Sequence, residues 1–400
     1  MGRRATSPSR IDRPRQSGRR TAAWLGPALL VPAVAVLPWL GAAGAGRSLA
    51  GLDEFPPPIG VPWDYVTFAW PAVAAVFASL AGLAAAWIHG ARQRETPPRT
   101  HPADRAMAAT TAPGRWPVWG SVAVVWTLAW WVVAWTRWPV SESVQRFTFF
   151  PLWLGFVVSV NACIHHRTGT CLMQRQPRRW LALFGVSAIF WWGFEWLNRF
   201  VLNWHYLGVD ELGPLAYAVH ATLSFSTVLP AVAAAAEWLD SHDRWRRITA
   251  RGVAWRWLAR RSTGLALLIG AGLALVFTGA LPRWFYPALW VAPLAWWLGA
   301  EILHQTRGGR GDARASAGVA AEVARGDWRA AGTWMAAALG CGFVWEMWNS
   351  RSLAHWIYTV PGVERWHVFE MPLVGYAGYL PFGVLCLLVT RRFIPLDPPR

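Results

Sequence analysis

The chain has 400 residues, of which 54% are hydrophobic and only 15% charged, and its mean hydropathy is positive. Apolar runs of about twenty residues recur along it, and that length crosses the hydrocarbon core of a bilayer. These features exclude a water-soluble globular protein. The net charge of +17 comes from 38 arginines and no lysine. Because the aromatic residues lie in the apolar runs and not in the basic loops, we expect no nucleic-acid partner.

Residues 1–22 are basic and contain several prolines and serines, so we predict a disordered N-terminus. A transmembrane hairpin is predicted over 23–88, from one apolar run at 23–43 and a second at 65–88. The small-residue spacing of Ala43-Gly44-Ala45 is also typical of a signal cleavage site. The first run is therefore either an uncleaved anchor or a cleaved signal. A linker rich in proline, threonine and arginine follows at 89–116 and is predicted to be cytoplasmic.

Two blocks of four apolar runs make up the rest of the chain. The first block, 117–240, has runs at 117–136, 148–165, 181–198 and 214–236. After a linker at 241–262, the second block, 263–392, has runs at 263–282, 285–303, 330–350 and 371–390, and a tail follows at 393–400. Because an open strand edge leaves backbone groups unpaired in hydrocarbon, we expect the runs to be helices. The predicted fold class is all-α, a polytopic transmembrane helical bundle of about ten spans.

The two blocks carry the same residues at nearly the same offset. Glu195 and Asn198 end the third run of the first block, and Glu346 and Asn349 end the third run of the second, 151 positions later. Leu229-Pro230 recurs as Leu380-Pro381 at that offset, and Trp204-His-Tyr206 recurs as Trp356-Ile-Tyr358 with one residue of slippage. We interpret the blocks as tandem four-helix repeats. An even number of crossings makes them parallel, and a binding site is expected where they meet.

The arginines indicate the orientation of the chain in the membrane. Of the 38, 31 fall in the N-terminus, the linkers, the tail and the loops on one side, against seven on the other side. The positive-inside rule then places both termini in the cytoplasm of a bacterial-type plasma (inner) membrane. Membrane lipids, and anionic lipid at the cytoplasmic face above all, are the expected partners.

The candidate catalytic residues are the two repeated pairs, Glu195 with Asn198 and Glu346 with Asn349. Each pair is spaced three residues apart and shares one face of its helix. An apolar setting and the negative end of the helix dipole disfavour a charged carboxylate, so we expect both glutamates to hold a proton. Candidate substrate-binding residues follow in the outer connections: Trp204, His205, Tyr206, His220, His355, Trp356, Tyr358, His367 and Glu370. Two alternatives give these residues no role in function: they are solvated at the outer membrane–water interface, or they form hydrogen bonds between helices.

A second polar set lies at the inner end of the second run of each block. It contains Asn161, His165 and His166 in the first block and Glu301 and His304 in the second. Glu301-x-x-His304 has the spacing of carboxylate-bridged metal sites in helical bundles, but the first block lacks the glutamate. We expect a structural or interfacial role for this set and no metal, and the sequence names no cofactor.

The segment from Trp345-Glu346 through Arg351 and Trp356-Ile-Tyr358 to Pro372 resembles the integral-membrane lycopene cyclase domain. That carotenoid- and isoprenoid-processing family is also built from tandem copies of a small helical unit. The resemblance implies an isoprenoid or other long apolar lipid as substrate, with Glu346 as the acid and Trp356 and Tyr358 as its aromatic partners. In the family two carboxylates follow the proline and are thought to drive cyclisation. Here Leu373-Val374-Gly375 follows Pro372, so the carboxylate pair is not matched.

Three classes of function fit these features. A lipid- or isoprenoid-modifying enzyme of cyclase, isomerase or hydratase type would use the buried glutamates as acids at the repeat interface. A transporter or flippase for a lipid or small solute would use them to bind a proton or a polar head. A non-catalytic membrane scaffold would use them only to join helices.

Overall fold

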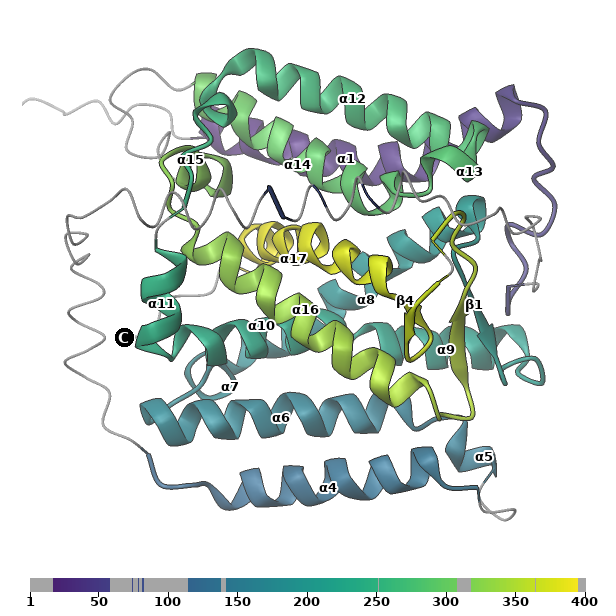
Figure 1. Cartoon of the computed structure of the whole chain (residues 1–400), viewed down its shortest axis with the longest axis vertical. Helices are drawn as coiled ribbons and strands as arrows, with labels where there is room; N and C mark the ends of the chain where they lie inside the picture. Colours follow the sequence, from purple (N-terminus) through teal and green to yellow (C-terminus); the bar gives the residue numbers. More distant parts are fainter. Residues whose placement is uncertain are drawn as a thin grey trace, which may run out of the picture.

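The computed structural model describes residues 17–57, 114–137, 142–250, 252–307, 318–363 and 365–394, with isolated positions at 74, 78, 81 and 82. This part of the chain is mostly helical (Figure 1). The α-helices are α1 (Ser17–Gly44), α4 (Val118–Trp135), α5 (Glu142–Gln145), α6 (Phe149–Thr168), α7 (Leu172–Arg175), α8 (Pro177–Val201), α9 (Pro214–Phe225), α10 (Val228–Asp240), α11 (Asp243–Thr249), α12 (Arg261–Ala280), α13 (Pro282–Phe285), α14 (Ala288–Arg307), α15 (Val319–Ala324), α16 (Arg329–Asn349) and α17 (Tyr379–Phe393). The 3-10 helices are η2 (Arg256–Ala259) and η4 (Leu373–Gly378), and the strands are β1 (Trp204–Leu207), β2 (His355–Tyr358), β3 (His367–Val368) and β4 (Met371–Pro372).

Several predicted segments lie wholly or largely outside the described residues. They are residues 1–16 of the N-terminus, most of the run at 65–88, most of the linker at 89–116 and residues 395–400 of the tail. α1 begins at Ser17, within the stretch predicted to be disordered, which corrects the predicted boundary. A helix satisfies its own backbone groups and can therefore extend beyond its apolar run.

Six helical segments in the described ranges are long and apolar enough to cross a membrane. They are Val118–Trp135, Phe149–Thr168, Pro177–Val201, Pro214–Asp240, Arg261–Ala280 and Leu373–Phe393, and a shorter apolar helix covers Ala28–Gly44. The helical, multi-pass membrane class predicted from the sequence is confirmed. The predicted runs at 285–303 and 330–350 correspond to α14 and α16, which are helical but are not among the six.

The long helices lie side by side in three groups (Figure 1). α1, α12 and α14 pack together at one edge of the bundle, and α4 and α6 form the opposite edge. Between them lie α8, α10, α16 and α17, where α10 contacts α6 and α16, and α17 contacts α14 and α16. The core of this central group is apolar, with Leu229, Phe382 and Leu385 almost fully buried.

The run predicted at 214–236 is divided into α9 and α10. Pro230 lies in the first turn of α10, where the N–H that proline lacks is not needed. The Ser187 hydroxyl of α8 donates to Phe225 O (2.6 Å) and accepts from Leu229 N (3.0 Å). One side chain thus satisfies backbone groups that the break leaves open inside the bundle.

Short strands lie at one end of the bundle, which we call the strand end (Figure 1). β1 pairs with β2 and β3 pairs with β4, both antiparallel. The run predicted at 371–390 begins as β4 and η4 and becomes α-helical only at Tyr379. The expectation that every run is helical throughout is therefore corrected. Paired strands satisfy each other's backbone groups where the chain leaves the helices.

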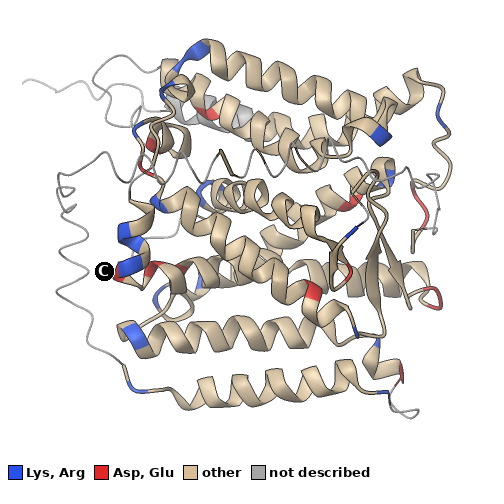
Figure 2. Ribbon diagram, in the orientation of Figure 1, with Lys and Arg blue, Asp and Glu red and all other residues tan. Residues whose placement is uncertain are grey.

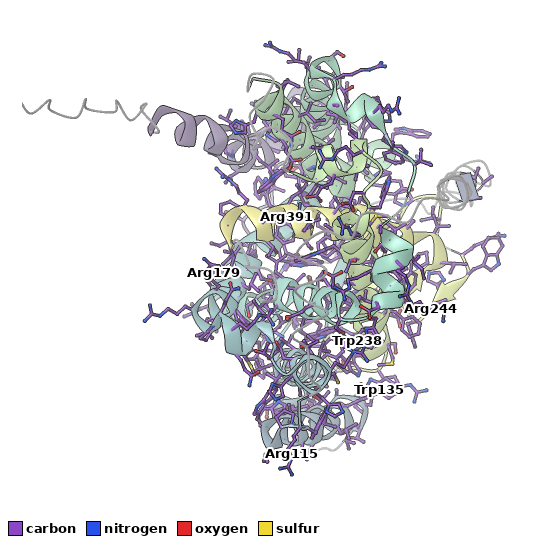
Figure 3. All side chains as sticks on the ribbon, turned by 90° about the vertical axis from the view of Figure 1, so that its left-hand side faces the viewer. Arg115, Trp135, Arg179, Trp238, Arg244 and Arg391 are labelled. Atoms are coloured by element: carbon purple, nitrogen blue, oxygen red, sulfur yellow. The ribbon has the colours of Figure 1, made fainter. Side chains whose placement is uncertain are left out.

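Arginines gather at the opposite end, which we call the arginine end (Figure 2). Arg115, Arg179, Arg244 and Arg391 all lie there although they come from distant parts of the chain (Figure 3). The helices between the two ends carry few charged side chains (Figure 2). This distribution is the one that a bilayer requires of a helical bundle.

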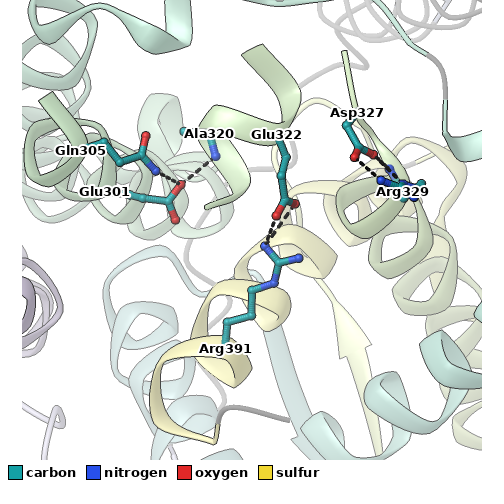
Figure 4. Close-up of polar contacts among 7 residues, drawn as sticks. All are labelled: Glu301, Gln305, Ala320, Glu322, Asp327, Arg329 and Arg391. Carbon is teal, nitrogen blue, oxygen red and sulfur yellow. Dashed lines mark hydrogen bonds and ion pairs between the residues drawn. The ribbon is translucent and has the colours of Figure 1, made fainter. Parts of the chain in front are cut away.

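Carboxylates at the arginine end hold short helices in place (Figure 4). Glu301 Oε1 accepts from Ala320 N (2.7 Å), in the first turn of α15, and from Gln305 Nε2 (3.2 Å). Glu322 of α15 forms an ion pair with Arg391 of α17 (2.9 Å). Beside α15, Asp327 pairs with Arg329 (2.7 Å).

The three members of the second polar set in the first block, Asn161, His165 and His166, also make structural contacts. Asn161 Oδ1 accepts from Met173 N (3.4 Å), in the first turn of α7. His165 Nδ1 lies 2.8 Å from Gln174 Oε1, and His166 Nδ1 lies 2.9 Å from Gly114 O. Asn161 and Glu301 therefore have the same structural role, since each accepts a backbone N–H from the first turn of a short helix, α7 and α15 respectively.

Candidate active site

A two-stranded ribbon, β1 with β2, forms one wall of the candidate site. Trp204 lies opposite Tyr358, and Tyr206 lies opposite Trp356. Since side chains alternate along a strand and directly opposed residues share a face, these four aromatic side chains lie on one face of the ribbon. His205 and Ile357, which lie opposite each other, are on the other face. The pairing is symmetric about this central pair, so each strand supplies one tryptophan and one tyrosine to the same face.

Glu195 of α8 lies behind the tyrosine of β1. It is 5% exposed, and its Oε1 accepts from Tyr206 Oη (2.6 Å), Trp191 Nε1 (2.9 Å) and Trp204 Nε1 (3.1 Å). Trp191 stands one helical turn before Glu195, whereas the other two donors come from β1. The carboxyl group is thus fixed by its own helix and by the ribbon.

Glu346 of α16 stands in the same relation to the tyrosine of β2. It is fully buried, and its Oε1 accepts from Tyr358 Oη (2.7 Å) and Tyr379 Oη (3.0 Å). Trp356 Nε1 donates to Tyr358 Oη (2.9 Å). Oε2 of Glu346 has no hydrogen-bond partner among the described residues.

Both tyrosines of the ribbon keep their hydroxyl protons. Burial, and next the charge of Glu195, raises the pKa of Tyr206 well above its ordinary value. Burial and the charge of Glu346 do the same to the pKa of Tyr358. The site therefore contains two Glu–Tyr pairs, Glu195–Tyr206 and Glu346–Tyr358, each with a neutral phenol donating to a carboxyl oxygen.

Besides the donors from the ribbon, each glutamate has one further donor, and it comes from a different helix in the two pairs. Trp191 supports Glu195, and the residue 151 positions after it is Gly342. Tyr379 supports Glu346, and the residue 151 positions before it is Val228. A Cβ added at Gly342 would overlap the Tyr379 ring. Beside each glutamate the space is filled by a large ring with a hydrogen-bond donor. Beside Glu195 this ring belongs to α8, and beside Glu346 it belongs to α17.

The two asparagines hold the ribbon to the helices. Asn198 Oδ1 accepts from Asn203 N (2.8 Å) and Trp204 N (3.3 Å), and its Nδ2 donates to Trp204 O (2.8 Å). Asn349 Oδ1 accepts from Trp356 N (2.8 Å), and its Nδ2 donates to Trp356 O (2.7 Å). Both amides were predicted to be catalytic; in the structure they are engaged with backbone groups and position the strands that carry the tyrosines.

A cavity of about 110 Å³, which we call the chamber, lies in front of the two tyrosines. Its aromatic lining consists of Phe149, Trp191, Trp204, Tyr206, Tyr217, Phe225, Trp290, Trp345, Trp356, Tyr358 and Tyr379. No arginine, aspartate or glutamate of the described chain lines it. A dry cavity of roughly 150 Å³ can bind benzene, so the smaller chamber has room for a short branched end of a longer apolar molecule but not for a substituted ring.

The structure brings most of the predicted binding residues together at the chamber. Trp204, Tyr206, His220, His355, Trp356 and Tyr358 line it. His367, which is exposed, and Glu370, which is half-buried, do not line it. His205 points to the other face of the ribbon. Glu195 and Glu346 contact the chamber only through their hydrogen-bond donors.

Sequence reasoning missed Trp191, Tyr217, Trp290, Trp345 and Tyr379. One signal was available, because Tyr379 immediately precedes the repeated Leu-Pro dipeptide. In the first block that position is Val228, so comparison of the two blocks alone did not single out the tyrosine.

A second cavity, of about 450 Å³, borders Glu195 from the other side. Asp53, Phe55, Trp192 and Arg199 are among the residues that line it. The Arg199 guanidinium lies over the Phe55 ring (4.7 Å to the centroid) and donates to Glu54 O (2.7 Å), which fixes the segment after α1 to α8. Glu195 therefore lies between two cavities.

The described residues contain no group of three or more histidine, cysteine, aspartate or glutamate side chains that could hold a metal ion. Groups that can give or take a proton lie at the chamber, with tyrosine hydroxyls at its surface and carboxyl groups behind them.

His205 is buried in its neutral form. Its Nε2 lies 3.0 Å from Thr359 Oγ1, and the Thr359 hydroxyl donates to Leu202 O. Since that hydroxyl has a single proton, Nε2 of His205 is the donor. Burial lowers the pKa of His205 below its ordinary value.

We expect this histidine to make the folded state sensitive to mild acid. The unfolded chain binds the proton at a pKa of about 6.5, whereas the folded chain resists protonation down to its lower pKa. The contribution is therefore fully present above about pH 6.5 and is lost as the pH falls toward the folded value. Thermal unfolding in detergent at a series of pH values measures it. His205→Gln keeps a donor for Thr359 and should flatten the dependence; an unchanged slope in this variant would contradict the assignment.

Comparisons of the chain with protein-family models, with curated proteins and with solved structures give no match. The site geometry is therefore the basis for inferring function.

Proposed function

We propose that the two blocks are parallel tandem repeats with the chamber between them. Both blocks show the same helix contacts, α4 with α6, α6 with α10 and α8 with α10 in the first, and α12 with α14, α14 with α17 and α16 with α17 in the second. The symmetric pairing of β1 with β2 and the two Glu–Tyr pairs support the same relation. In this arrangement the strand end faces outward and the arginine end faces the cytoplasm, where anionic lipid binds it.

We propose that the protein is a membrane enzyme that moves protons on an unsaturated apolar lipid of isoprenoid type, as an isomerase, cyclase or hydratase does. The observation that carries this proposal is the presence of two Glu–Tyr pairs directed at one aromatic chamber. A scaffold needs no chamber, and a site for a charged headgroup needs charged lining residues. The volume of the chamber indicates that one end of the lipid enters it while the rest lies among the helices or in the bilayer.

One Glu–Tyr pair can give a proton to the lipid while the other takes a proton from it. The hydroxyl of one tyrosine gives its proton to an olefin carbon, and its glutamate, when protonated, returns a proton to the phenolate oxygen. The cation on the neighbouring carbon is stabilised by the faces of the surrounding tryptophans. The tyrosine of the other pair takes a proton from an adjacent carbon and passes its own proton to its glutamate. One proton enters the lipid and one leaves it, so the double bond moves or a ring closes without a redox partner.

The test is mass spectrometry of lipid that copurifies with the full chain. We expect an unsaturated apolar lipid to be retained by the wild type and lost by Ala221→Phe, because Ala221 lines the chamber. Ala216→Phe is the matched control, since Ala216 is an exposed residue of the same helix. Retention of bulk phospholipid alone, identical in all three proteins, would overturn the proposal.

A further inference from the structure

We infer that the lipid end group bound in the chamber carries an oxygen atom, as a hydroxyl or ketone, held by Ser224 and Trp345. This inference rests on the proposed function and adds the class of substrate. Both residues line the chamber, Ser224 from α9 and Trp345 from α16. They therefore approach the ligand from different blocks of the chain.

Ser224 has a buried hydroxyl that makes no hydrogen bond with any described residue. The residue is 7% exposed, and its Oγ is buried and unpartnered. The neighbouring hydroxyls behave differently, because Ser226 Oγ donates to Leu223 O (2.6 Å) and Thr227 Oγ1 donates to Ser224 O (2.7 Å). A buried hydroxyl without a partner is costly, and it is found where a ligand or ordered water completes it.

Trp345 has an indole N–H that is also buried without a hydrogen-bond partner. It is 4% exposed, and its Nε1 has no acceptor within the described chain. The tryptophans that surround the glutamates do have acceptors: Trp191 and Trp204 donate to Glu195, and Trp356 donates to Tyr358. Because an indole N–H can only donate, the group that satisfies Trp345 must offer a lone pair.

Trp153 and Trp348 also have buried N–H groups without a described acceptor, but neither residue lines the chamber. The Trp153 ring packs against Trp345, and the Trp348 ring packs against Trp153. The inference therefore depends on Ser224 and Trp345 together. A serine hydroxyl can donate or accept and an indole N–H can donate, so a ketone or hydroxyl oxygen, with its two lone pairs, suits both. A hydrocarbon end group would leave both unpaired. A phosphate or carboxylate is disfavoured because no arginine lines the chamber.

The experiment compares two small branched probes of similar shape, 4-methylpent-3-en-2-one and 2,4-dimethylpenta-1,3-diene. Binding to the full chain in detergent is followed by quenching of tryptophan fluorescence, and each probe's partition into empty micelles is subtracted. We expect the wild type to prefer the ketone by about tenfold, which is the typical effect of one buried hydrogen bond. Ser224→Ala and Trp345→Phe should each reduce the preference toward one.

Ser226→Ala is the matched control, because that hydroxyl already donates to Leu223 O in the last turn of α9, and the ketone preference should persist in it. Equal binding of both probes by the wild type would overturn the oxygen site and leave the proposed enzyme standing. Binding of neither probe would count against the chamber as a ligand site and so against the proposed function itself.

Discussion

We expect Glu346→Gln to lower conversion of the proposed lipid substrate sharply and to leave the fold intact. The amide keeps an oxygen that can accept from Tyr358 and Tyr379, so the ring positions are preserved. It cannot give or take a proton, and removal of a general acid or base typically costs 10²- to 10⁴-fold in rate. The ratio of product to substrate in lipid extracts, measured by mass spectrometry at equal protein level, should fall by about that factor. Glu195→Gln should have the same effect, because in the proposed mechanism each pair performs half of the proton transfer.

Two further variants separate chemistry from structure. Tyr358→Phe keeps the ring and removes only the hydroxyl between Glu346 and the chamber, so it should lose conversion as well. Glu237→Gln alters a half-buried glutamate of α10 that pairs with Arg175 at the arginine end (2.6 Å). It should lower stability but not the conversion per folded molecule. Full conversion by Glu346→Gln or Tyr358→Phe would show that the pairs do not carry the proton.

The sequence was sufficient to predict the helical membrane class, because hydropathy alone decides whether a helix can lie in a bilayer. It did not predict that β1 pairs with β2. Those strands are four residues long and about 150 positions apart, and nothing local specifies the partner of so short a strand. The break between α9 and α10 was also missed, because it is stabilised by Ser187 from another helix.

The repeated residues located the glutamates and the ribbon tyrosines correctly as neighbours, because the proposed duplication keeps them at one offset. A comparison of the two blocks does not identify a site residue where the large side chain is on a different helix in each block. In the first block the large residue is Trp191 and the small one is Val228, whereas in the second block the small residue is Gly342 and the large one is Tyr379. Such an exchange preserves packing volume and removes the sequence match. The asparagines show a different limit: their repetition indicated importance, but only coordinates show that the amides bind backbone groups.

Asn198→Ala should be strongly destabilising. It removes three hydrogen bonds and leaves two backbone N–H groups and one carbonyl of a buried turn without their partner. An unsatisfied buried group costs about 1–3 kcal/mol, so we expect a total loss of roughly 3 kcal/mol or more. Asn349→Ala removes two bonds to the half-buried Trp356 and should cost less. Unfolding in mixed micelles with increasing dodecyl sulfate gives both values.

These expected losses of stability follow if the asparagines hold the ribbon in place and do not contact the substrate. Asn198→Asp keeps the acceptor for Asn203 N and Trp204 N and loses only the donor, so it should fall between wild type and Asn198→Ala. Asn161→Ala, at the arginine end, should be destabilising without changing probe binding in the chamber, since its partners are Val157 O and Met173 N. If Asn198→Ala were as stable as the wild type yet inactive, the amide would belong to the chemistry. If it is unstable and binds the chamber probes weakly, the amide acts by holding Trp204 and Tyr206 in front of Glu195, and proton transfer depends on that alignment.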